Sequence, residues 1–413
     1  MMVLSGIKNT VLLWVFLVAA CGNPTKKTEP KTAEVVADET EITAVPIVVG
    51  ANRTSEYLPL LQGKKVAVVA NQTSVIFKTN DSHVHLVDSL LSYQIEVKKV
   101  FAPEHGFRGE ADAGEKVTDG VDSKTGLPLI SLYGKNRKPS ATQLADIDVV
   151  LFDIQDVGVR FYTYIATLQL VMEACAENNV PIIVLDRPNP NGHYVDGPTM
   201  EMDHSGFLGM TPIPLVYGMT IAEYASMINE EGWLENRAKA NLTVVSLENY
   251  IHDSDYHLPI RPSPNLPNDV AINLYPSLGL FEGTNINAGR GTEFQFQRYG
   301  APFLESTKYS FTYTPEPNFG SKTPKQIGEV CYGKDLSKTP RMNEVSLQWL
   351  IDAYQNSKDK AKVFNTSGFT KHAGTDKLQQ QIVAGESEKE IKESWQKDLT
   401  NFRKIREKYL LYP

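Results

Sequence analysis

The sequence is poor in cysteine and has no excess of positive charge, and both shortages limit what it can do. Only three of its 413 residues are cysteine, and two of them, Cys175 and Cys331, lie in the part expected to fold. Two cysteines cannot build a zinc site; they form a disulfide, as in exported proteins, or stay as buried thiols. The net charge of −8 gives no basic face, so we expect no nucleic-acid partner.

Several motifs of cofactor and catalytic chemistry are also missing. No Gly-x-Gly-x-x-Gly follows the first predicted strand, which argues against a dinucleotide or phosphate cofactor. There is no Gly-x-Ser-x-Gly elbow and no His-Glu-x-x-His helix. His83 and His85 are two positions apart in a predicted helix, so they point to different sides and do not share a metal. We therefore expect neither a cofactor nor a metal.

The N-terminus has no apolar run long enough to cross a bilayer comfortably. Lys8 precedes the run Val11–Ala20, which is too short for a membrane span and is typical of a signal peptide over residues 1–20. The run closes on small residues directly before Cys21, as in a bacterial lipobox; the alternative is a plain secretory signal. Lipidated Cys21 would anchor the protein to a membrane of the cell envelope, on the periplasmic side or at the outer membrane.

The segment after the anchor lacks the residues that make a core. Residues 22–45 contain no aromatic side chain and mix lysine, glutamate, threonine and proline. Such a composition cannot bury enough apolar surface to fold, so we expect a disordered tether over residues 21–45.

From about residue 46 the pattern becomes that of an α/β protein. Nearly continuous apolar runs, as in strands covered on both faces, alternate with stretches of helical spacing. The strands are predicted at 65–70, 95–102, 129–132, 148–154, 181–185 and 242–247, and the helices at 82–93, 163–178 and 220–231. This alternation predicts a Rossmann-like, doubly wound parallel sheet over residues 46–260. A smaller α/β (α+β) domain follows over residues 261–413, with late helices near 346–355 and 388–409.

The stretch Phe101–Gly109, at the end of the second strand, concentrates ionisable residues. Pro103 stops the strand because its nitrogen has no proton to donate, and Glu104, His105 and Arg108 follow at once. In doubly wound sheets the carboxyl ends of the strands form one edge, where ligands bind.

Other strand ends bring similar residues to that edge. Each alone is better explained as a turn former, a helix cap or an ion pair, but their accumulation favours a site. The candidate catalytic residues are Glu104, His105, Asp153 and Asp156, and the candidate binding residues are Asn71, Arg108, Gln155, Arg160, Tyr162, Tyr164, Asp186, Arg187, Asn189, Glu282 and Arg290.

This inventory of carboxylates, amides, arginines and tyrosines suits a carbohydrate. Glycoside hydrolysis commonly uses two carboxyl groups in different protonation states. Glu104 stands between the apolar Phe101 and Phe107, a setting that fits a general acid. The second carboxylate is Asp153, Asp156, Asp186 or Glu282.

Motifs in order along residues 50–413 carry a family resemblance. They are PEHGFRG (103–109), TGLP (125–128), SLYG (131–134), FDIQDVGVRFYTY (152–164), LDRPNP (185–190), Pro212–Pro214 with GMTI (218–221), Pro262–Pro267, EGTN (282–285), GRGT (289–292), AGTD (373–376) and Tyr409–Tyr412. The chain resembles bacterial exo-β-N-acetylmuramidases of the NamZ type. Residues 321–336 match that family less clearly.

The resemblance implies an active site in a cleft between the two domains. It implies release of N-acetylmuramic acid from the non-reducing ends of peptidoglycan fragments, with Glu104 as the catalytic glutamate. The lactyl carboxylate of that sugar calls for a fork-shaped cation, and the candidates are Arg108, Arg160, Arg187 and Arg290. The 2-acetamido group is a further candidate nucleophile.

Two other functions fit the same residues. A non-catalytic lipoprotein that binds muropeptides for cell-wall recycling would use the same arginines and tyrosines. A metal-dependent hydrolase would use His105 with nearby aspartates.

Overall fold

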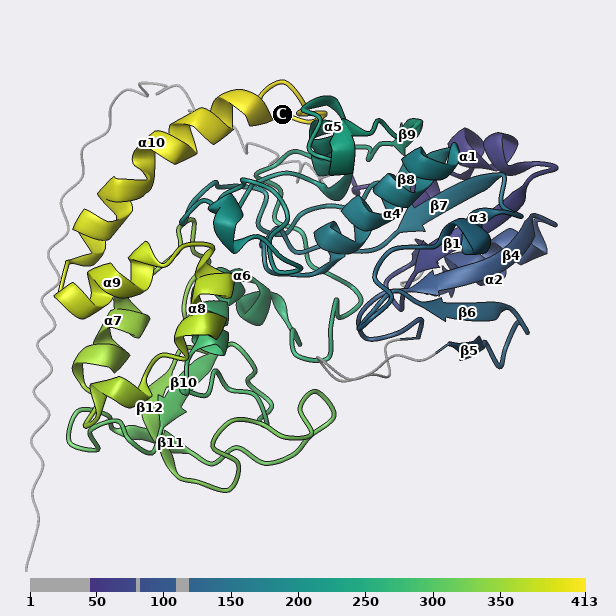
Figure 1. Ribbon diagram of the computed structural model, residues 1–413. Helices are drawn as coiled ribbons and strands as arrows, with labels where there is room; N and C mark the ends of the chain where they lie inside the picture. The colour runs from purple at the N-terminus through teal and green to yellow at the C-terminus, as the bar shows by residue number, and fades with distance from the viewer. Residues whose placement is uncertain (1–44, 79–81, 109–118) are drawn as a thin grey trace, which may run out of the picture. The chain divides into compact units, whose positions relative to one another are not determined.

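The structure is a computed structural model that describes residues 45–78, 82–108 and 119–413 (Figure 1). The predicted signal peptide, Cys21 and the tether up to residue 44 lie outside the described residues, and so does Gly109 of the loop after the second strand. Within the described ranges, no helix combines the length and the apolar character that crossing a membrane would require.

A seven-stranded sheet forms the first part of the fold. Its spatial order is β5-β6-β4-β1-β7-β8-β9, and all neighbours are parallel except β5, which runs antiparallel to β6. The strands are β1 (Lys65–Ala70), β4 (Glu96–Ala102), β5 (Gly120–Val121), β6 (Pro128–Ser131), β7 (Val149–Asp153), β8 (Ile182–Leu185) and β9 (Leu242–Val245). The six parallel strands have the Rossmann order 3-2-1-4-5-6, which confirms the predicted fold class.

Both faces of this sheet are covered, which explains its apolar sequence. Val66 and Val68 of β1 face one core, Ala67 and Val69 face the other, and all four are fully buried. Helices α1 (Thr54–Leu61) and α2 (Leu86–Ser92) contribute to the first core, and α3 (Ala141–Leu144), α4 (Tyr164–Asn178) and α5 (Ile221–Glu230) contribute to the second. Thr220 caps α5 through a capping box with Glu223, as its sequence indicates.

The second part is smaller and continues the core that includes α4 and α5. It contains a three-stranded antiparallel sheet in the order β10-β12-β11, with helices on one side and long loops on the other (Figure 1). Its elements are α6 (Asp269–Leu278), β10 (Arg298–Ala301), β11 (Phe311–Tyr313), β12 (Cys331–Asp335), α7 (Gln348–Gln355), α8 (Thr366–Ala373), α9 (Lys377–Ala384) and α10 (Glu388–Arg406). Short 3-10 turns connect them, of which η4 (Gly279–Gly283) matters for the site.

The predicted helix over residues 82–93 is wrong in its first turn. Residues His83–His85 form strand β3, paired antiparallel with β2 (Val75–Phe77), and the helix begins only at Leu86. The His85 ring caps that helix by accepting a hydrogen bond from the amide of Val87 at 3.3 Å. Pairing in a hairpin therefore overrides the helical spacing of this stretch.

The two cysteines of the folded part are not joined. Cys175 and Cys331 are both buried free thiols. Burial raises the pKa of each thiol to about 12, so neither is a reactive thiolate at neutral pH.

Candidate active site

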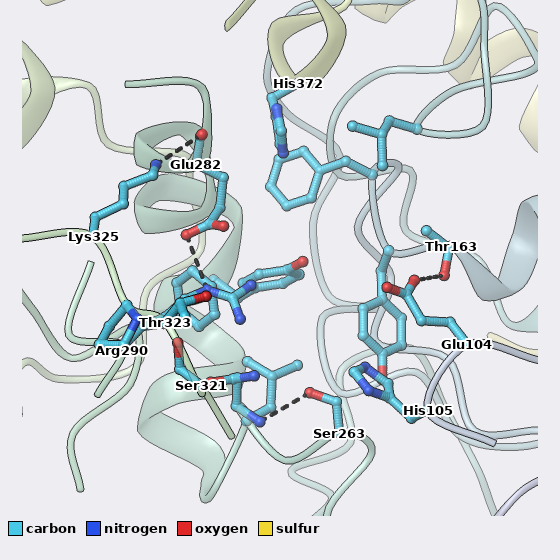
Figure 2. Close-up of a pocket in the computed structure, with 18 residues that line it drawn as sticks. Glu104, His105, Thr163, Ser263, Glu282, Arg290, Ser321, Thr323, Lys325 and His372 are labelled. Atoms are coloured by element: carbon cyan, nitrogen blue, oxygen red, sulfur yellow. Dashed lines mark hydrogen bonds and ion pairs between the residues drawn. The ribbon is translucent and has the colours of Figure 1, made fainter. Parts of the chain in front are cut away.

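The turn after β4 presents the glutamate on which the prediction centres. β4 ends at Ala102, and the carbonyl of Pro103 accepts a hydrogen bond from the amide of Gly106 at 3.0 Å. His105, inside this turn, has a φ of +69°, a value at which turns usually place glycine or asparagine. Non-glycine residues in this conformation cost energy and cluster at functional sites. The strained turn aims Glu104 and His105 into a cavity (Figure 2).

Glu104 is held by a hydroxyl group from a distant part of the chain, and a second hydroxyl group lies near it. The hydroxyl of Thr163, at the N-terminus of α4, donates to Oε2 of Glu104 at 2.7 Å. The phenol of Tyr133 lies near the same carboxylate: burial raises the pKa of Tyr133, and the negative charge of Glu104 raises it further. A hydroxyl group donates or accepts, so Thr163 can hold the carboxyl group in either protonation state.

Two tyrosines attach the proline-rich connector to this wall. The hydroxyl of Tyr162 donates to the carbonyl of Pro262 at 2.8 Å, and the hydroxyl of Tyr164 lies 3.4 Å from the same oxygen. Their rings pack edge to face, 4.7 Å apart. Ser263 and Asn265, which follow Pro262, line the cavity as a result.

The opposite wall belongs to the second part of the chain and carries a charged cluster (Figure 2). Nε of Arg290 lies 3.1 Å from Oε1 of Glu282. Nζ of Lys325 donates to the carbonyl oxygens of Phe281 and Glu282, each at 2.9 Å, which closes the end of η4. Burial by itself would raise the pKa of Glu282, but the positive charges of Arg290 and Lys325 outweigh it and lower the pKa, so this carboxylate is ionised.

His372 completes that wall as a neutral imidazole. Its Nδ1 lies 2.9 Å from the carbonyl oxygen of Gly368, and since a carbonyl only accepts, Nδ1 carries the proton. Burial lowers the pKa of His372. The other ring nitrogen, Nε2, is therefore an acceptor.

Together these walls enclose a cavity of about 380 Å³. This lies at the small end of ligand pockets, which span roughly 300–1,000 Å³. The lining residues are Glu104, His105, Phe161, Tyr162, Thr163, Leu208, Ser263, Asn265, Leu266, Tyr275, Glu282, Arg290, Phe296, Ser321, Thr323, Pro324, Lys325 and His372. Of the residues predicted from the sequence, the structure brings Glu104, His105, Tyr162, Glu282 and Arg290 into it.

Other predicted residues form a buried network at the ends of β1, β7 and β8. Arg187 makes a two-pronged ion pair with Asp153, at 2.6 and 2.8 Å, and both side chains are almost fully buried. The side-chain oxygen of Asn71 accepts from Thr73, and the side chain of Gln155 donates to the carbonyls of Asp156 and Pro188. These contacts fix the strand ends from which the site loops depart.

Asp156, Asp186 and Asn189 also have internal partners. Asp156 accepts from the hydroxyl of Tyr217 and the amide of Gly158, and burial raises its pKa to about 6. Burial raises the pKa of Asp186 to about 7, and its carboxylate accepts from Thr220 and from Tyr412 near the C-terminus. Asn189 donates to the carbonyl of Met219.

Two predicted arginines lie away from the cavity. Arg108 stacks on Phe107 and forms a two-pronged ion pair with Asp122, at 3.1 and 2.8 Å. Arg160 is fully buried, and its guanidinium donates only to backbone carbonyls. These belong to Pro198, Ile213, His372 and Ala373, at 2.6 to 3.1 Å. Burial lowers the pKa of Arg160 to about 9, and it stays charged at neutral pH.

Sequence reasoning missed Thr163, Lys325 and His372. Two of them had a signal: Thr163 stands between the two tyrosines of the FYTY motif, and His372 directly precedes AGTD. Lys325 lies in the stretch that matches the family least clearly, and nothing in its local sequence marks it.

One group of described residues has the geometry to hold a metal ion, and it lies apart from the cavity lining. Ligand atoms of Glu201, His204 and Asp376 lie within 4.8 Å of one another. Nζ of Lys377 lies 2.6 Å from Oε1 of Glu201, so the lysine side chain already neutralises part of the negative charge of this group. Over the described ranges, His105 belongs to no such group.

Comparisons with known proteins agree with one another. Residues 66–270 match the family model described as exo-β-N-acetylmuramidase NamZ, N-terminal, and residues 273–412 match its C-terminal counterpart. The chain is 40% identical over 376 residues to the peptidoglycan β-N-acetylmuramidase NamZ of Bacillus subtilis, which covers 86% of this chain and 89% of that protein. Crystal structures of two DUF1343 family proteins from Bacteroides fragilis are similar, with 42% identity and a TM-score of 0.81 for one and 29% and 0.75 for the other. Each covers 89% of this chain and 99% of its own.

Proposed function

The chain belongs to the NamZ family of exo-β-N-acetylmuramidases, and we propose that its cavity removes N-acetylmuramic acid from the non-reducing ends of peptidoglycan fragments with Glu104 as the proton donor. The observation that carries this proposal is the position of Glu104, which lines the cavity on one wall while a cationic cluster lines the other. The cavity suits one sugar unit better than a long strand, which agrees with attack at a chain end.

The reaction is hydrolysis of a glycosidic bond. The carboxyl group of Glu104 gives its proton to the glycosidic oxygen as the bond to the anomeric carbon breaks, so the rest of the fragment leaves as an alcohol. Water then supplies a hydroxyl group to the anomeric carbon, and the proton that this water releases restores the acid form of Glu104. Thr163 keeps the carboxyl group in place through both protonation states. Tyr275, Tyr162 and Phe161 give the cavity aromatic surface against which a sugar face can pack.

We assign Arg290 to the lactyl carboxylate of the terminal N-acetylmuramic acid, the sugar unit that is cleaved from the chain end. Of the four arginines that the sequence offers for this role, it is the one that lines the cavity; Arg108 pairs with Asp122, Arg187 pairs with Asp153, and Arg160 binds carbonyls. Lys325 adds a second positive charge to the same wall, against the single negative charge of Glu282. A carboxylate is therefore attracted to this wall, which orients the sugar with its anomeric carbon toward Glu104.

Glu104→Gln tests the assignment of the proton donor. Glutamine keeps the size of the side chain but has no proton of comparable acidity, so turnover of a muramic-acid–glucosamine disaccharide should fall on the order of a hundred- to ten-thousand-fold. Glu393→Gln on the exposed face of α10 is the matched control and should keep full activity. Full activity of Glu104→Gln would refute the assignment. Calorimetric binding without any turnover by the unmodified protein would instead favour a muropeptide-binding lipoprotein.

We also propose that the protein is anchored to a membrane of the cell envelope through a lipid on Cys21. The apolar run Val11–Ala20 and the small residues before Cys21 support this. Mass spectrometry of the mature N-terminal peptide should show an acylated cysteine, and Cys21→Ser should release the protein into the soluble fraction. An unmodified mature N-terminus at another residue would contradict the proposal. Membrane fractionation would then assign the periplasmic side of the inner membrane or the outer membrane.

A further inference from the structure

A tight hairpin separates the cavity from a second groove. Gly206 and Gly209 exchange two backbone hydrogen bonds, at 3.0 and 2.8 Å, which leaves Phe207 and Leu208 at the tip. Leu208 lines the cavity that contains Glu104, whereas Phe207 lines a neighbouring groove of about 490 Å³. The hairpin packs closely against Met200 and Arg160, since a Cβ atom at Gly209 would overlap the end of the Met200 side chain and lie 3.2 Å from Cδ of Arg160. The tip therefore stands between the two hollows in a fixed position.

A chain of contacts leads from the catalytic carboxyl group into this groove. The phenol of Tyr133 lies near the Glu104 carboxylate, whose charge raises the pKa of Tyr133, and the centre of the Tyr133 ring lies 6.2 Å from that of Phe207. The guanidinium carbon of Arg137 lies 4.2 Å from the centre of the Phe207 ring. Tyr133 and Phe207 are both half-buried, so each has ring surface that a ligand can reach.

The groove also carries positive charge with which no carboxylate of the described residues pairs. Lys138 is held by three carboxylates, those of Glu173, Glu177 and Glu235, at 2.7 to 3.4 Å. Lys135 and Arg137, in contrast, are exposed, and neither pairs with a carboxylate among the residues that the structure describes. On a chain with a net charge of −8, two such cations beside an aromatic ring favour an anionic ligand.

We propose that this groove binds the part of the glycan that leaves, on the reducing side of the scissile bond. This rests on the proposed function, because that part of the substrate must leave the cavity next to Glu104. The glucosamine unit lies along Tyr133 and Phe207, and a carboxylate beyond it reaches Arg137 and Lys135. That carboxylate comes from the lactyl group of the next muramic acid or from a peptide stem attached to it.

Binding measurements on two lengths of glycan test the proposal. The Glu104→Gln protein, which does not consume its ligand, is titrated calorimetrically with the muramic-acid–glucosamine disaccharide and with the tetrasaccharide that repeats it. Arg137→Ala should weaken tetrasaccharide binding about three- to fivefold, as for an exposed ion pair, and should leave disaccharide binding within experimental error. High salt should remove the difference. Phe207→Ala should weaken both ligands, because both place glucosamine on the ring.

Controls separate this proposal from the one it rests on. Lys397→Ala removes an exposed positive charge from α10 and should leave the ratio of the two affinities unchanged. A tetrasaccharide that carries a peptide stem shows the source of the carboxylate: a larger Arg137→Ala effect assigns it to the stem, and an equal effect assigns it to the lactyl group. Equal weakening of disaccharide and tetrasaccharide, or none, would overturn the groove assignment. Failure of the unmodified enzyme to hydrolyse the disaccharide would overturn the proposed function alone, and the affinity ratio would still be measurable.

Discussion

The hydroxyl group of Thr163 lies 2.7 Å from Oε2 of Glu104, although the two residues are 59 positions apart. Thr163 occupies the cap position of α4, yet its side chain makes no capping hydrogen bond to that helix. The hydroxyl that would ordinarily stabilise the helix end is directed at the carboxyl group instead. Helix α4 thus connects the end of β7 to the turn after β4 through one side chain.

Thr163→Val should slow turnover while leaving substrate binding nearly unchanged. Valine keeps the shape of threonine but cannot hold the carboxyl group of Glu104, so kcat should fall about three- to tenfold, the range for one hydrogen bond. KM should change little, since the hydroxyl contacts Glu104 rather than the sugar. Thr163→Ser, which keeps the hydroxyl, should restore most of the rate. Equal losses in the serine and valine variants would show that Thr163 acts through packing alone.

Arg290→Gln should reduce the preference for muramic acid over glucosamine. If Arg290 binds the lactyl carboxylate, its loss should lower kcat/KM for a muramic-acid glycoside roughly ten- to hundredfold, as for a hydrogen-bonded charge pair. The glucosamine glycoside has no such group, so its slower hydrolysis should be less affected. The measurement is the ratio of the two kcat/KM values. A parallel loss on both glycosides would mean that Arg290 serves only to hold Glu282.

Arg160→Lys should destabilise the protein far more than a surface arginine change. Lysine cannot reach the four carbonyl groups that the buried guanidinium satisfies, and each buried acceptor left without a donor costs about 1–3 kcal/mol. We expect the free energy of unfolding in urea to fall by about 3 kcal/mol or more. Arg403→Lys, whose guanidinium is exposed and binds a single carbonyl, is the matched control and should change it by less than about 0.5 kcal/mol. Similar values for both variants would contradict this account.

Asp156 should make stability depend on pH in a defined window. Burial raises its pKa from the ordinary 3.8 to about 6. A raised pKa means that the folded protein binds this proton more tightly, so the contribution is complete below about pH 4 and is lost as the pH rises through 6. The shift corresponds to roughly 3 kcal/mol.

The test of this window compares Asp156→Asn with the unmodified protein. Between pH 4 and pH 7 the variant should lose less stability, because its amide does not titrate. Other carboxylates contribute equally to both proteins and cancel in the difference. A difference that stays constant over this range would show that Asp156 does not titrate there.

The sheet could be predicted from the sequence because its strands are buried on both faces. A short, nearly continuous apolar run such as Lys65–Ala70 is best explained as a strand that is buried on both faces. The same holds for the apolar runs that form β7 and β8. The stretch 82–93 misled the prediction because its spacing suits a helix while its first residues pair with β2. Helix α6 was not predicted, since it follows a proline-rich connector and contains a proline itself.

The ionisable residues at strand ends predict only part of the site. Glu104 and Asp153 carry the same local signal, a carboxylate at the end of an apolar strand, but one lines the cavity and the other is neutralised by Arg187. Whether such a carboxylate lines the cavity or forms an ion pair depends on the residues at the end of the neighbouring strand. The order of the strands in the sheet, which decides those neighbours, cannot be read from a single sequence. Lys325 and His372 reach the cavity through packing between segments far apart along the chain, for which no local pattern exists.

The buried guanidinium of Arg160 joins the two parts of the chain at backbone level. It donates to the carbonyl of Ile213 in the first part of the chain and to those of His372 and Ala373 at the end of α8 in the second part. His372 is also the residue whose ring lines the cavity. Consider a hybrid protein that combines the first part of this chain with the second part of a relative. It would assemble both cavity walls only if the relative's second part placed backbone carbonyl oxygens where those of His372 and Ala373 lie. The two segments must therefore diverge together, and a change tolerated in one will often require an answering change in the other.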